Sequence, residues 1–202
     1  MSDVLEVKHL SVSFFTRQGE AQAVRNVSFS LKKGEILALV GESGCGKSAL
    51  CSSIMKLLPA SAKQKAGQIL LDGEDITGYP ERKMCTLRGS RFSMVFQDPM
   101  TALDPAMTIG DQIAEAVKQQ KADQKQRLSR EQVYHRVEEL MELVGIDYPA
   151  ERSRQYPHQF SGGMRQRAVL AVALAGNPEI IFADEPTTAL DVTVQAQILD
   201  LF

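Results

Sequence analysis

The chain has 202 residues, of which 44% are hydrophobic and 24% are charged, a composition typical of a globular protein with one well-buried core. Its formal net charge of −2 argues against nucleic acid as the main partner, because domains that bind nucleic acid usually carry a basic excess. Cys45, Cys51 and Cys85 lack metal-ligand spacing and indicate a reducing compartment, and no apolar run reaches the roughly 20 residues that span a bilayer.

The first part of the chain predicts strands followed by a helix. Residues 5–10 and 12–15 are short apolar-rich segments, and residues 27–31 alternate apolar side chains with serine, the period of a half-buried strand. The continuous apolar run at 36–40 predicts a central strand buried on both faces. After a glycine-rich loop, residues 48–58 predict a helix that Pro59 ends.

The second part is mostly helical. A strand at 93–96 comes first, and residues 129–132 have the form of a capping box that opens a helix ending at Gly145. Another helix is predicted after residues 161–163, and residues 180–183 predict a second buried strand.

This order of elements predicts an α/β core with an all-helical insert. The core comprises residues 1–98 and 178–202, and the insert comprises residues 99–177. Within the insert, the polar segment 119–130 is expected to be an exposed linker between two helices, and residues from Val192 onward are expected to be helical.

A phosphate-binding loop lies between the predicted strand at 36–40 and the following helix. The sequence there matches the pattern G-x-x-x-x-G-K-S/T, in which backbone N–H groups and a helix N-terminus surround phosphate. A glycine-rich turn without a ligand is the alternative, and the strand–helix context disfavours it. The candidate nucleotide-binding residues are Gly41, Glu42, Ser43, Gly44, Cys45, Gly46, Lys47, Ser48 and Ala49.

Two of these residues have roles in the predicted chemistry. Lys47 is expected to reach the β- and γ-phosphates and to act in catalysis, and the Ser48 hydroxyl is expected to ligate Mg²⁺. The strand at 180–183 runs into an acidic pair, where Asp184 is expected beside Mg²⁺ and Glu185 is expected to polarise the attacking water. Strands often end at an aspartate, so the acidic pair alone is weak evidence for a metal site. The phosphate-binding loop earlier in the chain makes that interpretation stronger.

A serine and two glycines at 161–163 form a second candidate phosphate site, made of a hydroxyl, backbone N–H groups and a helix N-terminus. Residues 160–167, FSGGMRQR, resemble the signature motif of ATP-binding-cassette (ABC) proteins. The resemblance implies two chains paired head to tail, each lending its signature to the phosphate-binding loop of the other. It also implies that Ser161, Gly162, Gly163 and Gln166 contact nucleotide. A simple serine cap on the helix is the alternative.

Smaller matches extend the resemblance along the chain. Gln97 resembles the family's Q-loop glutamine, which implies a catalytic and Mg²⁺-sensing role, and Asp191 resembles the D-loop aspartate at the nucleotide sandwich. Phe14 falls where the family stacks an aromatic ring on adenine, with Phe15 as the second choice and a core position as the alternative. The implied fold is a P-loop NTPase core with an N-terminal antiparallel β subdomain and the helical insert of ABC proteins.

The segments QDPMTALDP, YPHQ and DEPTTALD, which begin at Gln97, Tyr156 and Asp184, resemble the peptide and nickel importer branch. This resemblance implies hydrolysis of ATP with Mg²⁺ to energise uptake of di- or oligopeptides, nickel chelates or similar solutes. The implied partners are a second ABC ATPase subunit, two transmembrane permease subunits and, indirectly, an extracytoplasmic solute-binding protein. The expected location is the cytoplasmic face of the cell membrane, as a peripheral subunit.

The sequence departs from the family pattern in two places. Cys45 stands where the family usually has serine, and ATP binding is expected to survive because the backbone does the binding. The family's switch histidine lies beyond the last residue of this chain, since His9, His135 and His158 are all upstream. The chain is therefore expected to be C-terminally truncated, with weak or absent hydrolysis.

Two other functions share these motifs. A soluble mechanical ATPase of the DNA-repair class would carry a long coiled coil, and the short insert shows no sustained heptads. A nucleotide-binding module without turnover is disfavoured by Glu185.

Overall fold

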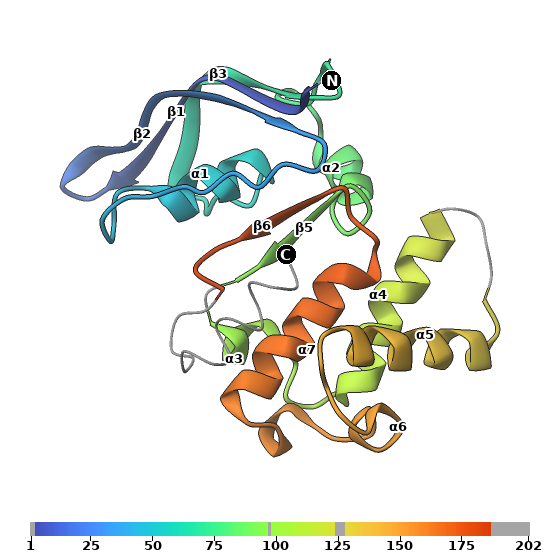
Figure 1. Cartoon of the computed structure of the whole chain (residues 1–202). Coiled ribbons are helices and arrows are strands. Elements are labelled where there is room, and N and C mark those ends of the chain that lie inside the picture. The colour runs from blue at the N-terminus through green and yellow to red at the C-terminus, as the bar shows by residue number, and fades with distance from the viewer. Residues whose placement is uncertain (1–2, 97, 124–127, 187–202) are drawn as a thin grey trace. The chain divides into compact units, whose positions relative to one another are not determined.

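A computed structural model describes residues 3–96, 98–123 and 128–186 of the protein, and Figure 1 shows its elements. The chain divides into two compact units, residues 1–84 and residues 85–202. The predicted division into a core at 1–98 and 178–202 and an insert at 99–177 stays a prediction.

The first unit contains a four-stranded antiparallel sheet in the order β2-β1-β3-β4. Its strands are β1 (Asp3–Thr16), β2 (Gly19–Lys32), β3 (Ala62–Leu71) and β4 (Glu74–Asp75). Strand β1 is central, and its Val7 lies between Phe29 of β2 and Ile69 of β3. The strands predicted at 5–15 are confirmed as one continuous strand. The alternation predicted at 27–31 is also confirmed, since the serines are exposed and the apolar residues are half-buried.

The helix of this unit, α1 (Lys47–Ile54), has Leu50 and Ile54 buried along one side. The sequence predicted that this helix continues to Leu58, but it ends at Ile54. It ends there because Lys56 adopts the left-handed conformation with φ 53°. The N–H of Leu57 then donates to the Ser52 carbonyl over 2.7 Å, and the N–H of Lys56 donates to the Ser53 carbonyl over 3.1 Å. These two bonds form a Schellman end, which terminates the helix before Pro59 is reached.

The prediction of a buried strand at 36–40 is wrong, because the structure has no strand there. The segment is not part of a sheet, and Ile36 and Val40 are 78% and 94% exposed. An apolar run becomes a buried strand only where neighbouring strands take up its backbone hydrogen bonds. Among the described residues, the sheet of this unit gives the segment no such neighbour, and hydrophobic periodicity alone does not reveal that.

The second unit contains a parallel pair of strands, β5 (Phe92–Val95) and β6 (Ile180–Ala183). The register pairs Phe92 with Ile180 and Val95 with Ala183, so the C-terminal ends of both strands lie at the same edge of the sheet. The rings of Phe92 and Phe182 meet edge to face with 5.8 Å between their centroids. Both strands predicted in this part of the sequence are confirmed.

Helices make up the rest of the second unit, and α4, α5 and α7 lie together in Figure 1. Their apolar faces share one buried cluster that includes Ile113, Val137, Met141 and Leu170. The helical elements are α2 (Glu81–Leu87), which spans the boundary of the two units, α3 (Pro99–Ala102), α4 (Ile109–Asp123), α5 (Arg130–Leu143), α6 (Pro149–Arg152), the 3-10 turn η1 (Pro157–Gln159) and α7 (Gly162–Ala175). None of the helices within the described ranges is long and apolar enough to cross a membrane.

The predicted boundaries of α5 are confirmed. Ser129 Oγ accepts from the Gln132 N–H over 3.2 Å, and Gln132 Oε1 accepts from the Ser129 N–H over 2.9 Å, which completes the capping box. Gly145 ends the helical run with φ 75°. The linker predicted at 119–130 is partly wrong, because α4 continues to Asp123, and residues 124–127 lie outside the described ranges.

A hydrogen-bonded carboxylate ties α4 to α5. The Tyr134 hydroxyl donates to Asp111 Oδ1 over 2.5 Å, and the Thr108 hydroxyl donates to Asp111 Oδ2 over 2.7 Å. These two bonds, chiefly the one from Tyr134, lower the pKa of Asp111 below its ordinary value. A lowered carboxyl pKa stabilises the fold above the pKa of the unfolded chain, and this stabilisation is lost as the pH falls through the folded-state pKa.

We therefore expect Tyr134→Phe to lower the free energy of unfolding at neutral pH by about 1 kcal/mol or less, since the carboxylate is solvent-exposed. The difference from the parent should shrink in acid, where Asp111 becomes protonated in both proteins. Thermal unfolding from about pH 7 to about pH 3 measures this change. Tyr148→Phe is the matched control, because Tyr148 is 72% exposed. A Tyr134→Phe deficit that stays constant with pH would contradict the assignment to Asp111.

Candidate functional site

The phosphate-binding loop leads directly into α1 with its backbone turned by glycines. Gly44 and Gly46 have φ values of 79° and 99°, in the left-handed region that glycine adopts without strain. Gly46 is the N-cap of α1, and this N-cap has no side-chain capping hydrogen bond. A Cβ at Gly46 would strike the Ala23 carbonyl oxygen of β2, so close packing also requires glycine there.

Lys47 folds its ammonium back over the loop. Its Nζ donates to the Gly41 carbonyl over 2.9 Å and to the Glu42 carbonyl over 3.0 Å. The positive charge is therefore held against the exposed loop backbone, beside an N-terminal helix end that attracts anions. Phosphate oxygens are better acceptors for an ammonium than amide carbonyls, so a bound phosphate can replace these two partners.

Cys45 lies inside this arrangement. Its thiol is exposed, and its Sγ lies 4.0 Å from Lys47 Nζ. A Cβ added to Gly41 would come within 2.6 Å of the same sulfur, which shows how closely the thiol covers the start of the loop. The Cys45 N–H donates to the Glu42 carbonyl over 3.3 Å. The thiol therefore lies next to both the loop backbone and the Lys47 ammonium.

The remaining loop residues are accessible to a ligand in varying degree. Ser43 is exposed in the loop, Ser48 is exposed in the first turn of α1, and Ala49 is half-buried. On β1, Phe14 is half-buried and Phe15 is 41% exposed. The ammonium groups of Lys63 and Lys65 lie 5.9 and 5.4 Å from the centroid of the Phe15 ring. The assignment of adenine stacking to Phe14, with Phe15 as the second choice, stays a prediction.

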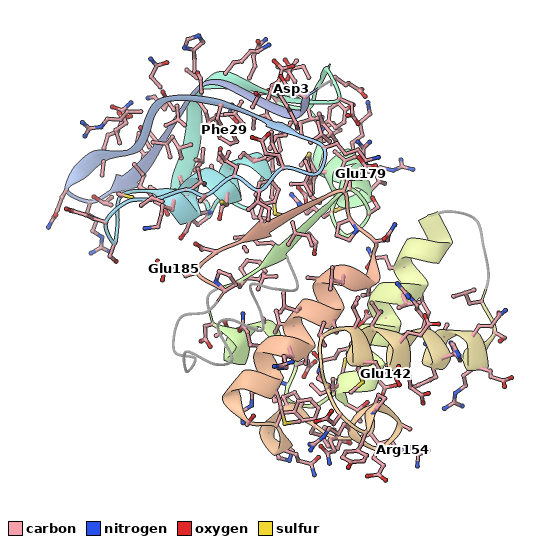
Figure 2. All side chains as sticks on the ribbon, viewed as in Figure 1. Asp3, Phe29, Glu142, Arg154, Glu179 and Glu185 are labelled. Carbon is pink, nitrogen blue, oxygen red and sulfur yellow. The ribbon has the colours of Figure 1, made fainter. Side chains whose placement is uncertain are left out.

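The acidic pair follows β6 without interruption, and Figure 2 shows Glu185 at the end of this strand. The Asp184 N–H donates to the Val95 carbonyl over 2.9 Å, which continues the parallel ladder by one residue and fixes where the carboxylate begins. Glu185 has φ 47°, a conformation that is strained for a residue other than glycine. Asp184 is half-buried and Glu185 is exposed, at the C-terminal edge of the strands where α/β proteins commonly bind ligands.

The signature residues begin α7. Ser161 is its N-cap, and Ser161 Oγ accepts from the Met164 N–H over 3.3 Å. Ser161 and Gly162 are exposed and Gly163 is half-buried, so this helix N-terminus is accessible. Gln166, which the resemblance placed at the nucleotide, is only 2% exposed, and its Nε2 atom has no hydrogen-bond partner among the described residues.

From the sequence alone, no role was predicted for the two arginines of the same motif. Arg165 Nε donates to the Pro157 carbonyl over 2.7 Å, and Arg167 Nη1 donates to the Val144 carbonyl over 2.6 Å. Both arginines are visible in the sequence of the motif, but only the structure shows which carbonyl groups their side chains reach. Two expected site residues, Gln97 and Asp191, lie outside the described residues.

The expected site residues are divided between the two units. The loop and Phe14 belong to the first unit, and the acidic pair and the signature belong to the second. The Ser48 hydroxyl and the Asp184 carboxylate are hard oxygen donors of the kind that Mg²⁺ prefers. Within the first unit, the glycine-lined start of α1 is of the kind that accommodates a phosphate group.

Comparison with known proteins decides the family. The sequence profile described as "ABC transporter" matches residues 24–188, which is most of the chain. The chain belongs to the ABC transporter family.

The relatives of this ABC protein include ATP-binding proteins of dipeptide and oligopeptide transport. It is 55% identical over 203 residues to the dipeptide transport ATP-binding protein DppD of Bacillus subtilis (strain 168), covering 100% of this chain and 59% of that protein. It is 53% identical over 199 residues to the oligopeptide transport ATP-binding protein OppD of the same organism, covering 98% of this chain and 54% of that protein. The chain thus spans less than two thirds of the length of these relatives.

A solved structure supports the fold. A dimeric ATP-binding cassette in a post-hydrolysis state, bound to ADP and Pi, superposes with a TM-score of 0.85 at 27% identity. The match covers 98% of this ABC chain and 80% of the other. The predicted fold class, a P-loop NTPase core of the ABC type, is confirmed.

The glycines of the loop provide a test of its geometry. Gly46→Ala should destabilise the protein more than Gly44→Ala, because both have positive φ but only Gly46 would also strike the Ala23 carbonyl. We expect roughly 1–2 kcal/mol for Gly44→Ala from its backbone conformation alone, and a larger loss for Gly46→Ala.

Urea unfolding of both variants measures these costs. Gly78→Ala is the control, because Gly78 has no positive φ and a Cβ there would meet nothing among the described residues within 4 Å. Equal losses for Gly44→Ala and Gly46→Ala would show that the contact with β2 does not constrain the loop.

Proposed function

We propose that this chain is the ATP-binding and ATP-hydrolysing part of an ABC importer subunit that energises uptake of di- or oligopeptides, with nickel chelates or similar small solutes as related cargo. The observation that carries the proposal is the start of α1, where an exposed glycine loop, an uncapped helix N-terminus and the Lys47 ammonium come together. The names of the relatives, which are dipeptide and oligopeptide transport proteins, support the choice of cargo.

Each residue has a physical role in this proposal. The loop backbone from Gly41 to Gly46 donates N–H groups to the phosphates, and Lys47 replaces its bonds to the Gly41 and Glu42 carbonyls with bonds to the β- and γ-phosphates. Ser48 and Asp184 would hold Mg²⁺, which neutralises charge on the phosphate oxygens.

Glu185 is the general base of the proposed reaction. Its carboxylate accepts a proton from the attacking water as the water oxygen bonds to the γ-phosphorus. The bond from that phosphorus to the β–γ bridging oxygen breaks, and ADP leaves with the electron pair. The exposed position of Glu185 beyond β6 leaves its carboxylate accessible to this water. Gln97 is proposed to contact Mg²⁺ and to assist this hydrolysis.

The proposed active form pairs two ATPase subunits head to tail, so that Ser161 and the first N–H groups of α7 reach the nucleotide on the loop of the partner chain. The dimeric state of the similar cassette structure supports this pairing. The further proposed partners are two transmembrane permease subunits and, through them, an extracytoplasmic solute-binding protein. The proposed location is the cytoplasmic face of the membrane, as a peripheral subunit.

ATP turnover measured against protein concentration, with Mg²⁺ present and binding recorded in the same samples, tests the proposal. We expect turnover to be weak and to rise faster than linearly with concentration, because two chains complete each site. Lys47→Ala should remove both binding and turnover and serves as the blank.

Other outcomes separate the alternatives. Binding without turnover would favour a nucleotide-binding module, and turnover that requires DNA would favour the mechanical class. A folded chain that does not bind ATP would overturn the proposal.

A further inference from the structure

One carbonyl group in the segment leading into the signature serine accepts two hydrogen bonds. The Pro157 carbonyl in η1 accepts from the Phe160 N–H over 3.1 Å and from Arg165 Nε over 2.7 Å. Phe160 itself is only 2% exposed and belongs to the buried cluster of the helices. The Pro157 carbonyl therefore joins the backbone just before Ser161 to a side chain that returns from α7.

A second arginine fastens α7 to the end of α5. Arg167 Nη1 donates to the carbonyls of Val144 and Gly145 over 2.6 and 3.2 Å. Carbonyls at the C-terminal end of a helix have no partner within the helix and carry partial negative charge, so a guanidinium is favoured there. Gly145 accommodates the guanidinium because it has φ 75° and no side chain, and a Cβ there would strike Arg167 Nη1.

The residue between the two arginines has another orientation. Gln166 is buried within the helical unit, whereas Arg165 and Arg167 are half-buried and reach carbonyls of two different segments. One arginine fixes the chain that enters Ser161, and the other fixes the helix that leaves it. Because an α-helix is stiff over one or two turns, these two contacts act with the buried core to fix where the N–H groups of Gly162 and Gly163 point.

We propose that Arg165 and Arg167 are positioning residues that hold the signature serine and the N-terminus of α7 in the geometry needed to bind the nucleotide of a second chain. This inference rests on the proposed function, in which the signature acts across the dimer. Neither arginine needs to touch nucleotide. Their loss should weaken the nucleotide-dependent association of two chains and leave ATP binding by the loop of a single chain unchanged.

The experiment uses the full chain with Glu185→Gln as the parent, so that bound ATP is not consumed. ATP binding is measured at low protein concentration, and ATP-dependent dimer formation is measured by sedimentation. Arg167→Gln and Arg165→Gln should raise the dimer dissociation constant about tenfold or more, while ATP affinity of the single chain changes by less than about twofold. Arg167→Lys should restore part of the association, because an ammonium can still reach one carbonyl.

Arg136→Gln is the matched control, since its guanidinium donates to Glu139 over 2.8 Å on the surface of α5, and it should associate as the parent does. Gly145→Ala disturbs the Arg167 contact from the side of α5 and should reproduce the Arg167→Gln pattern. The inference would be overturned if both arginine variants associated as strongly as the parent. It would also be overturned if they lost ATP binding to the same extent as association. A parent that binds no ATP, or that never associates with it, would instead refute the proposed function.

Discussion

The organisation of this protein depends on one property of α-helices, which is that the N–H groups of the first turn have no carbonyl partner within the helix. Most helices satisfy these groups with a capping side chain, as Ser129 and Gln132 do for α5. At α1 a glycine stands in the cap position without a side-chain capping bond, and the Lys47 ammonium is bonded to carbonyls of the preceding loop. The result is a positive helix end of the kind that attracts phosphate groups.

Much of each unit serves to hold such a helix end in place. In the first unit the Ala23 carbonyl of β2 packs against Gly46, so the antiparallel sheet supports the loop directly. In the second unit the shared core of α4, α5 and α7 holds the body of α7, and two arginines fasten its beginning. The parallel pair β5 and β6 delivers Asp184 and Glu185 to a defined strand edge. Membership of the ABC transporter family accounts for this combination of a phosphate loop, an acidic strand end and a serine–glycine helix start.

Sequence reasoning recovered the elements whose signals are local. The strands at 27–31 and 180–183, the Ser129 capping box and the start of α7 at Ser161 all follow from short-range patterns, and the structure confirms them. The failures arose where distant atoms decide the outcome. The run at 36–40 depends on neighbouring strands, and the end of α1 depends on Lys56 adopting a left-handed conformation. The roles of Arg165 and Arg167 depend on carbonyls that only the folded chain brings within reach.

The central claim is that ATP binds at the loop before α1, and the thiol of Cys45 within this loop can report it directly. The measurement is the rate of alkylation of each cysteine, followed by mass spectrometry with and without Mg²⁺–ATP. Cys85 is also exposed and serves as the internal reference. The account predicts that ATP slows alkylation of Cys45 and leaves Cys85 unchanged, and that alkylated protein no longer binds ATP. Equal alkylation of Cys45 with and without ATP, in a folded protein, would contradict it.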